Sequence, residues 1–147
     1  MSEPVRVTVD VDPRVGPMKI ISTESIPWVS FIDPTGWIDP GCELKRLTNP
    51  ECDVRLELLR FPPNFVAPSH WHETDTVYLV MRGVFTVEGE GDYKPGDTRW
   101  VKAGTAYGRE TAGPDGCDVY FITAGAPAIR NPEVDPPPRG YWYEADR

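Results

Sequence analysis

Residues 70–83 read HWHETDTVYLVMRG, and this stretch decides the fold. His70 and His72 are the only two histidines of the 147-residue chain, and they stand one residue apart. Side chains two positions apart share a face on an extended segment, whereas on a helix they diverge. An extended segment therefore aims both imidazoles into one space, as a metal site or a ligand pocket requires. The alternative is a surface strand that happens to carry two histidines.

The residues after this pair predict a β-structure. Residues 76–81 form an unbroken β-favouring apolar run, expected to be buried on both sides, and Gly83 is expected to turn the chain into residues 84–88. Seventeen prolines and thirteen glycines separate the apolar runs. Strand-like runs recur at roughly 8–12-residue spacing, which is typical of an all-β sandwich or barrel. The other expected strands cover residues 42–47, 54–61, 98–102 and 119–123.

Charge and composition limit the kinds of binding partner and the cellular setting that we expect. A net charge of -8 and a pI near 4.7 disfavour binding to nucleic acid or to an anionic membrane. No run of 18 apolar residues and no signal peptide are present, so we expect no membrane span. Cys42, Cys52 and Cys117 lack paired spacing, which indicates reduced thiols in a cytoplasmic protein, with a single disulfide as the alternative.

These motifs resemble those of the cupins, small RmlC-like barrels. The family's first motif has a His-x-His pair and a closing glycine, matched by His70, His72 and Gly83. Gly96 and Gly104 match glycines of the second motif. The resemblance implies an antiparallel jelly-roll β-barrel.

The resemblance also implies a division of the chain. The barrel is expected over residues 42–126, after an N-terminal arm with edge strands over residues 1–41. A proline-rich tail over residues 127–147 is expected to pack on the barrel or on a partner subunit, because aromatic residues 141–143 are unusual in a disordered segment. We therefore expect a homodimer.

Two metal-ligand positions of the family are changed in this chain. Thr76 stands where the family has its acidic ligand, and Tyr107 stands where it has a third histidine. The resemblance implies a divalent ion (Fe, Zn, Ni, Mn or Cu) held by His70 and His72, with Tyr107 and His72 as catalytic residues. Thr76, Tyr78 and Tyr107 are expected to line the pocket.

The missing donors leave alternatives open. Water, Tyr107 or one carboxylate could complete a two-histidine site. If the metal has been lost, the histidines would hydrogen-bond a small molecule or act as acid and base. An inward arginine would clamp a substrate carboxylate, although a surface position is expected for both arginines in alternating strands. The candidate carboxylates are Glu57, Glu73, Asp75 and Glu110, and the two arginines are Arg55 and Arg99.

The resemblance favours an enzyme that acts inside the barrel on a small, oxygen-bearing organic molecule. Dioxygenase-, decarboxylase-, isomerase- and cyclase-like reactions all occur on this fold, which does not choose among them. The alternative is a non-catalytic ligand-binding or sensor domain without a metal. The motifs also resemble cupins of bacterial anti-sigma factors and of small diketone- or hydroxyacetophenone-cleaving dioxygenases.

Overall fold

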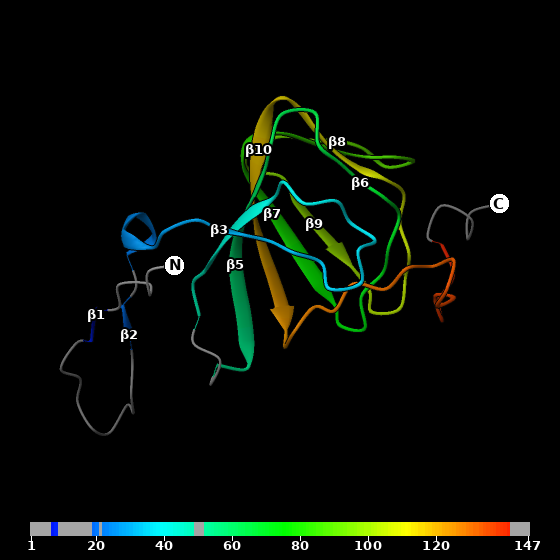
Figure 1. The fold of residues 1–147 in the computed structure, drawn as a ribbon, viewed down its shortest axis with the longest axis horizontal. Coiled ribbons are helices and arrows are strands. Elements are labelled where there is room, and N and C mark those ends of the chain that lie inside the picture. Colours follow the sequence, from blue (N-terminus) through cyan, green and yellow to red (C-terminus); the bar gives the residue numbers. More distant parts are fainter. Residues whose placement is uncertain (1–6, 9–18, 21, 49–51, 142–147) are drawn as a thin grey trace.

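The computed structural model describes residues 7–8, 19–20, 22–48 and 52–141. Of the expected N-terminal arm with edge strands over residues 1–41, the described part is residues 7–8, 19–20 and 22–41. Trp142 and Tyr143 of the aromatic tail lie outside the described residues, as does the rest of residues 142–147. Figure 1 shows the strands curving around a common interior.

The described chain is almost entirely antiparallel β-structure, as predicted. One sheet runs in the order β3-β4-β5-β10-β7-β8, with β6 paired to β10 and β9 paired to β7. β1 and β2 form a separate two-stranded sheet. A short 3-10 turn covers Thr23–Ser25. The strands are β1 (Val7–Thr8), β2 (Lys19–Ile20), β3 (Val29–Ser30), β4 (Glu43–Arg46), β5 (Val54–Phe61), β6 (Val66–Ala67), β7 (Thr76–Val87), β8 (Gly91–Tyr93), β9 (Thr98–Val101) and β10 (Glu110–Ala124).

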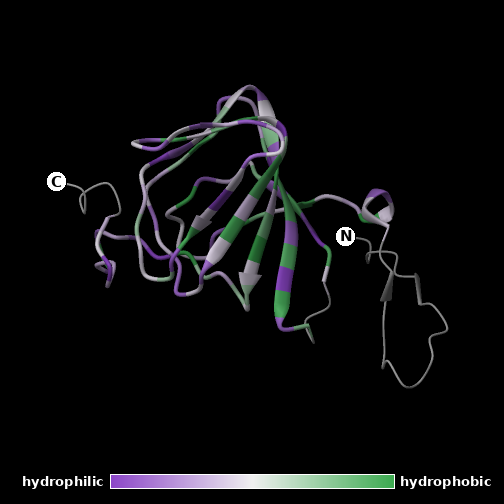
Figure 2. Cartoon of the chain, turned by 180° about the vertical axis from the view of Figure 1, so that it is seen from behind, coloured by the Kyte–Doolittle hydropathy of each residue, from purple (hydrophilic) through white to green (hydrophobic). Residues whose placement is uncertain are grey.

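Alternation along β5 decides which residues enter the barrel. Its bounds, Val54–Phe61, match the expected strand residue for residue. The alternating hydropathy of this strand is visible in Figure 2 as bands. Phe61 points into the core, and Glu57 pairs in register with Phe121 of β10, which pairs in turn with Tyr78 of β7. This row across three strands forms one wall of the interior.

Aromatic rings fill the interior. Tyr78 and Phe121 have ring centroids 4.9 Å apart, and Phe61 and Phe85 have theirs 5.7 Å apart. All four side chains are buried. Burial of each such side chain contributes about 1.5–3 kcal/mol to stability. The packing places Tyr78 and Phe121 next to the histidines.

The structure corrects the expected turn at Gly83. β7 runs without interruption from Thr76 to Val87, and Gly83 lies inside it with a φ of 73°. A Cβ added to Gly83 would lie 2.0 Å from the carbonyl oxygen of Gly116 on the neighbouring strand. The register of β7 with β10 shifts between Ala112 and Cys117, so the glycine belongs to a bulge rather than a hairpin turn.

The segment after β10 lies on its own barrel as far as Tyr141. Trp71 and Arg130 form an isolated antiparallel bridge, and the indole Nε1 of Trp71 donates to the carbonyl oxygen of Asp135 over 2.8 Å. Ala106 bridges Tyr141 in parallel. These contacts hold the segment beside the histidines. Within the described ranges, no helix is long and apolar enough to cross a membrane.

Candidate functional site

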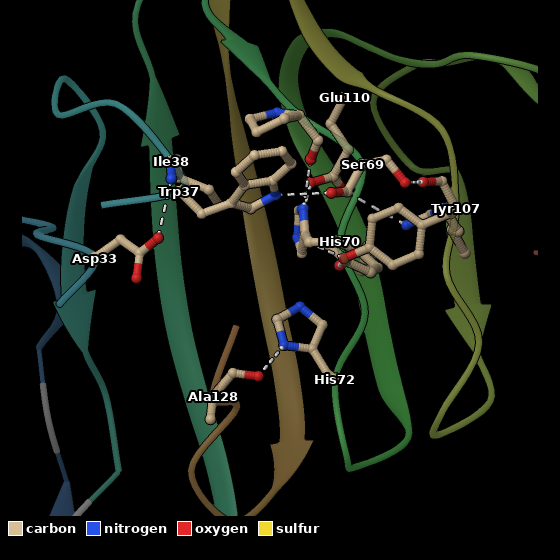
Figure 3. Close-up of polar contacts among 12 residues, drawn as sticks. Asp33, Trp37, Ile38, Ser69, His70, His72, Tyr107, Glu110 and Ala128 are labelled. Carbon is tan, nitrogen blue, oxygen red and sulfur yellow. Dashed lines mark hydrogen bonds and ion pairs between the residues drawn. The ribbon is translucent and has the colours of Figure 1, made fainter. Parts of the chain in front are cut away.

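The two histidines lie in an extended connection between β6 and β7. The backbone N–H of Gly104 donates to the carbonyl oxygen of His72 over 2.8 Å, and that of Tyr107 donates to the carbonyl oxygen of His70 over 3.4 Å. The loop after β9 therefore fixes the histidine segment. Both rings face the same interior, as their spacing predicts, with centroids 5.1 Å apart at 89° (Figure 3).

Backbone carbonyls set the tautomer of each ring. Nδ1 of His70 lies 2.8 Å from the carbonyl oxygen of Pro68, and Nδ1 of His72 lies 3.1 Å from that of Ala128. A carbonyl oxygen only accepts, so each Nδ1 carries the hydrogen and each Nε2 is left as an acceptor.

Tyr107 donates a hydrogen bond to the free ring nitrogen of His70. The Tyr107 hydroxyl lies 2.7 Å from Nε2 of His70 and 3.0 Å from the hydroxyl of Tyr78. Because Nε2 of His70 can only accept, Tyr107 donates to it and accepts from Tyr78. The carbonyl oxygen of Pro68 thus orients the whole chain of hydrogen bonds. The Tyr107 side chain is 0% exposed and backs His70.

A buried charge network lies beyond this chain. Arg99 of β9 forms a bidentate pair with Glu90, at 2.6 and 2.7 Å. Its guanidinium carbon lies 4.4 Å from the ring centre of Tyr107 and 4.8 Å from that of Tyr78. Nη1 of Arg99 lies 3.6 Å from Oε2 of Glu110, and neither of these buried atoms has a hydrogen-bond partner among the residues that the structure describes.

Burial shifts the protonation of the ionisable groups. It lowers the pKa of His70 to about 3 and that of His72 to about 4. It raises the pKa of Glu110 to about 7 against the opposing effect of Arg99. The pKa values of the Tyr78 and Tyr107 hydroxyls are also raised, chiefly by burial. Near neutral pH the site therefore holds uncharged imidazoles and phenols beside a carboxyl that exchanges its proton.

A cavity of about 240 Å³ opens in front of the histidines. His70, His72, Tyr78 and Glu110 supply polar groups to its wall, and Arg46, Arg55 and Glu57 line another part. Apolar side chains form most of the remainder. They include Phe31, Ile38, Leu44, Leu59, Phe61 and Phe121.

The structure brings some of the predicted residues to the cavity and others not. His70, His72 and Tyr78 line it, as expected. Thr76 and Tyr107 are fully buried but lie outside the lining, which corrects their predicted place on the pocket wall. The Tyr107 hydroxyl contacts Nε2 of His70 and the hydroxyl of Tyr78 instead of the cavity.

Of the four candidate carboxylates, two face the cavity and two do not. Glu57 and Glu110 are buried and face the cavity. Asp75 accepts a hydrogen bond from the backbone N–H of Ala103, and Glu73 pairs with Arg130 at 3.1 Å, so both are engaged outside the cavity. The site carboxylate nearest the histidines is Glu110, with Oε1 3.5 Å from Nε2 of His70.

One sequence expectation about β9 was wrong. Arg99 was expected on the surface and is 5% exposed, whereas its neighbour Trp100 is 68% exposed in this chain. The pairing of Arg99 with Tyr78, a core residue, fixes this parity. The strand's short TRWV pattern favours the opposite choice, because tryptophan is the more apolar residue. Only the pairing of β9 with β7 reveals that Arg99 points inward.

The donor set does not fit the divalent metal that the resemblance implies. Among the described residues, no group of three or more His, Cys, Asp or Glu side chains is placed to hold an ion. Nε2 of His70 already accepts from Tyr107. The nearby Arg99 guanidinium adds a buried positive charge, and two imidazoles alone are too few donors for a stable centre.

Comparison with known proteins identifies the class. The model of the ChrR cupin-like domain matches residues 17–126, well over half of the chain. Together with the antiparallel barrel, this match confirms the predicted jelly-roll cupin. The chain belongs to the family of ChrR cupin-like domains.

Solved structures agree on the fold. The polyketide cyclase RemF from Streptomyces resistomycificus is similar with a TM-score of 0.67 at 18% identity, covering 82% of this chain and 89% of that one. An acetylacetone dioxygenase from Acinetobacter johnsonii has a TM-score of 0.56 at 20% identity, covering 72% of each chain. A chain in the structure of Rhodobacter sphaeroides SigE in complex with the anti-sigma ChrR has a TM-score of 0.55 at 19% identity. The match covers 69% of this chain and 51% of that one. No curated protein matches the sequence.

Proposed function

We propose that this cupin is an enzyme that moves a proton on a small, oxygen-bearing organic molecule inside the barrel, without a metal. One observation carries the proposal: Oε2 of Glu110, a buried atom with no hydrogen-bond partner among the described residues, belongs to a side chain that lines the same cavity as His72. A buried polar atom without a partner is costly, so a ligand that supplies partners binds there favourably.

The two groups have complementary roles. Nε2 of His72 only accepts, so it binds a hydroxyl of the substrate. Glu110 has a pKa near 7, which suits a group that takes and returns a proton at neutral pH. Its carboxylate removes the proton from a carbon beside a carbonyl and delivers the same proton to the resulting enolate oxygen. The products are the enol and the regenerated carboxylate, as in an isomerase- or cyclase-like reaction.

The remaining residues hold this pair in place. Tyr107 positions His70 from behind rather than touching the substrate, which revises its predicted catalytic role. Arg99, 3.6 Å from Glu110, stabilises the carboxylate form. Apolar walls exclude water from the reacting atoms.

The test uses a metal-free sample. The chelated protein is incubated in D2O with 2-hydroxyacetophenone, which has a hydroxyl and a carbonyl on adjacent carbons, and NMR follows deuterium entering the intervening CH2 group. We expect accelerated exchange that falls about 10²–10⁴-fold in Glu110→Gln, the usual contribution of a general base. Glu88→Gln, at an exposed pair with Arg109, is the matched control. Equal rates for the unmodified protein and Glu110→Gln count against the proposal, and binding without exchange favours a sensor domain.

A metal-dependent enzyme is the second candidate, and one observation favours it. Metal-ligating histidines usually donate their other ring N–H to a backbone carbonyl, as both His70 and His72 do here. Metal analysis of untagged protein, with His70→Ala and His72→Ala, separates the candidates. Stoichiometric metal that is lost in both variants would support the second candidate over the first.

We also propose that the protein is a homodimer. Trp100 of β9 and Met81 of β7 are large apolar side chains exposed in the single chain. An exposed tryptophan of this kind is typical of interfaces.

A further inference from the structure

Strands β4 and β5 contribute three charged residues to the cavity wall. Glu57 is a buried carboxylate on β5, and Arg55 precedes it by two residues on the same face. Arg46 of β4 pairs with Glu57 in register. All three side chains line the cavity.

The two arginines share one carboxylate. Nε of Arg55 lies 3.2 Å from Oε1 of Glu57, and Nε of Arg46 lies 3.6 Å from Oε2. Two guanidinium groups against one carboxylate leave an excess positive charge at this end. Each guanidinium has five N–H donors, and within the described residues the ion pair of Arg55 uses only its Nε. Its two terminal nitrogens form an edge that suits a carboxylate with two oxygens.

Partial burial makes this arginine effective. The Arg55 side chain is 25% exposed, whereas that of Arg46 is 59% exposed. An ion pair formed by Arg55 is therefore less screened by water than one formed by Arg46. Arg55 is the primary candidate, and Arg46 adds to the potential at the opening.

The strand register relates the position of Arg55 to that of His72. Arg55 pairs with Thr123 of β10, one inward row from the row of Glu57, Phe121 and Tyr78. The ring of His72 lies 5.5 Å from that of Phe121. A ligand in this cavity can therefore contact both Arg55 and His72, with its apolar part against side chains such as Phe31, Leu59 and Phe121.

We infer that the ligand of this cavity is an organic acid: a carboxylate held by Arg55, an apolar or aromatic middle, and a hydroxyl or carbonyl facing His72 and Glu110. The role of the second end rests on the proposed function, whereas the recognition of the carboxylate rests on Arg55 and its neighbours alone. The cavity of about 240 Å³ lies below the usual range for drug-sized ligands, which limits the acid to a compact one.

The test compares one acid with its uncharged amide. Isothermal titration calorimetry measures binding of 4-hydroxycinnamate and of 4-hydroxycinnamamide, which differ only in the charged group. We expect the acid to bind the unmodified protein at least tenfold more tightly than the amide. In Arg55→Gln the acid should lose about tenfold and the amide should change little. Arg109→Gln, on the exposed pair with Glu88, should leave both affinities unchanged.

Three outcomes would overturn the inference: amide and acid binding equally, acid binding unaffected by Arg55→Gln, or no saturable binding of either probe. Glu110→Gln separates this inference from the proposed reaction. If that variant keeps the preference for the acid while deuterium exchange is absent from all samples, the carboxylate site stands and the proton-transfer function falls.

Discussion

The hydroxyl of Tyr107 lies 2.7 Å from Nε2 of His70, at the ring atom that the cupin motif would otherwise leave free for a metal. Tyr107 also occupies the sequence position of the family's third histidine. Tyr107, which stands at one metal-ligand position of the family, therefore hydrogen-bonds the nitrogen of His70 that would coordinate a metal. His70 is therefore held by hydrogen bonds at both of its ring nitrogens.

Removing that hydroxyl should destabilise the barrel. Tyr107→Phe leaves Nε2 of His70 without its donor and the hydroxyl of Tyr78 without its acceptor, both in the buried core. We expect the free energy of unfolding to fall by about 1–3 kcal/mol, the usual cost of an unsatisfied buried group. Urea denaturation followed by fluorescence measures it. Tyr120→Phe, at a half-buried residue of β10, should change stability by less than about 0.5 kcal/mol. Similar losses in the two variants would show that the hydroxyl pair contributes little.

Restoring an imidazole at position 107 should restore metal binding. Tyr107→His supplies a third nitrogen ligand and removes the phenol that occupies Nε2 of His70. We expect Zn²⁺ or Ni²⁺ to bind this variant at least tenfold more tightly than the unmodified protein, as measured by calorimetry and metal analysis. Tyr107→Phe removes the phenol without adding a ligand and is the control. Tight stoichiometric binding by the unmodified protein would contradict this expectation.

Glu110 should oppose the histidines in the pH dependence of stability. The folded state lowers the pKa of His70 to about 3 and that of His72 to about 4, so the unfolded chain binds more protons below pH 6.5 and acid destabilises the fold. The folded state raises the pKa of Glu110 from 4.5 to about 7. Its contribution to stability is therefore present below pH 4.5 and is lost as the pH rises towards 7.

Glu110→Gln tests this opposition. Between pH 4.5 and 6.5 the variant should lose stability on acidification more steeply than the unmodified protein, by about 1.4 kcal/mol per pH unit for one proton. Urea denaturation at a series of pH values measures the slope. Glu88→Gln should leave the slope unchanged because Glu88 is exposed. A slope unaffected by Glu110→Gln would mean that the carboxyl titrates alike in both states.

The β7 bulge should not tolerate a side chain. Gly83→Ala places a Cβ 2.0 Å from the carbonyl oxygen of Gly116, at a φ of 73°. Gly36 has the same φ of 73°, but a Cβ there would meet no atom within 4 Å, so Gly36→Ala isolates the backbone strain. That strain costs about 1–2 kcal/mol. Thermal denaturation should show a clearly larger loss for Gly83→Ala than for Gly36→Ala. Equal losses would mean that β7 and β10 move apart at this bulge without a further loss of stability.

The exposed face of β9 should carry the subunit contact. Trp100→Glu places a charge on a side chain that is 68% exposed in the single chain. If Trp100 is buried between subunits, the unmodified protein has twice the chain mass by light scattering and the variant has the mass of one chain. Val134→Glu, at an exposed residue of the C-terminal segment, should keep the mass of the unmodified protein. A dimer unaffected by Trp100→Glu would place the interface elsewhere.

The sequence predicted the fold more fully than the site. Alternation over residues 54–61 predicted β5 because a half-buried strand repeats every two residues, a local rule. The Gly83 turn was wrong because a bulge needs a neighbouring strand at close range, and only the pairing with Gly116 reveals it. Arg99 was misplaced for a related reason: its partner Glu90 and the rings of Tyr78 and Tyr107 meet it only in the closed barrel.

The sequence by itself predicted that both histidines share one face, since side chains two residues apart on an extended segment point the same way. The closed barrel made that face the interior. The sequence also named Glu57 and Glu110 among the candidate carboxylates. Only the tertiary structure decided which atoms remain available. A carbonyl oxygen 2.8 Å from one ring nitrogen of His70 and a tyrosine hydroxyl 2.7 Å from the other come from separate parts of the chain. Hydrogen-bond direction depends on such distant neighbours, which residue spacing along the sequence does not reveal.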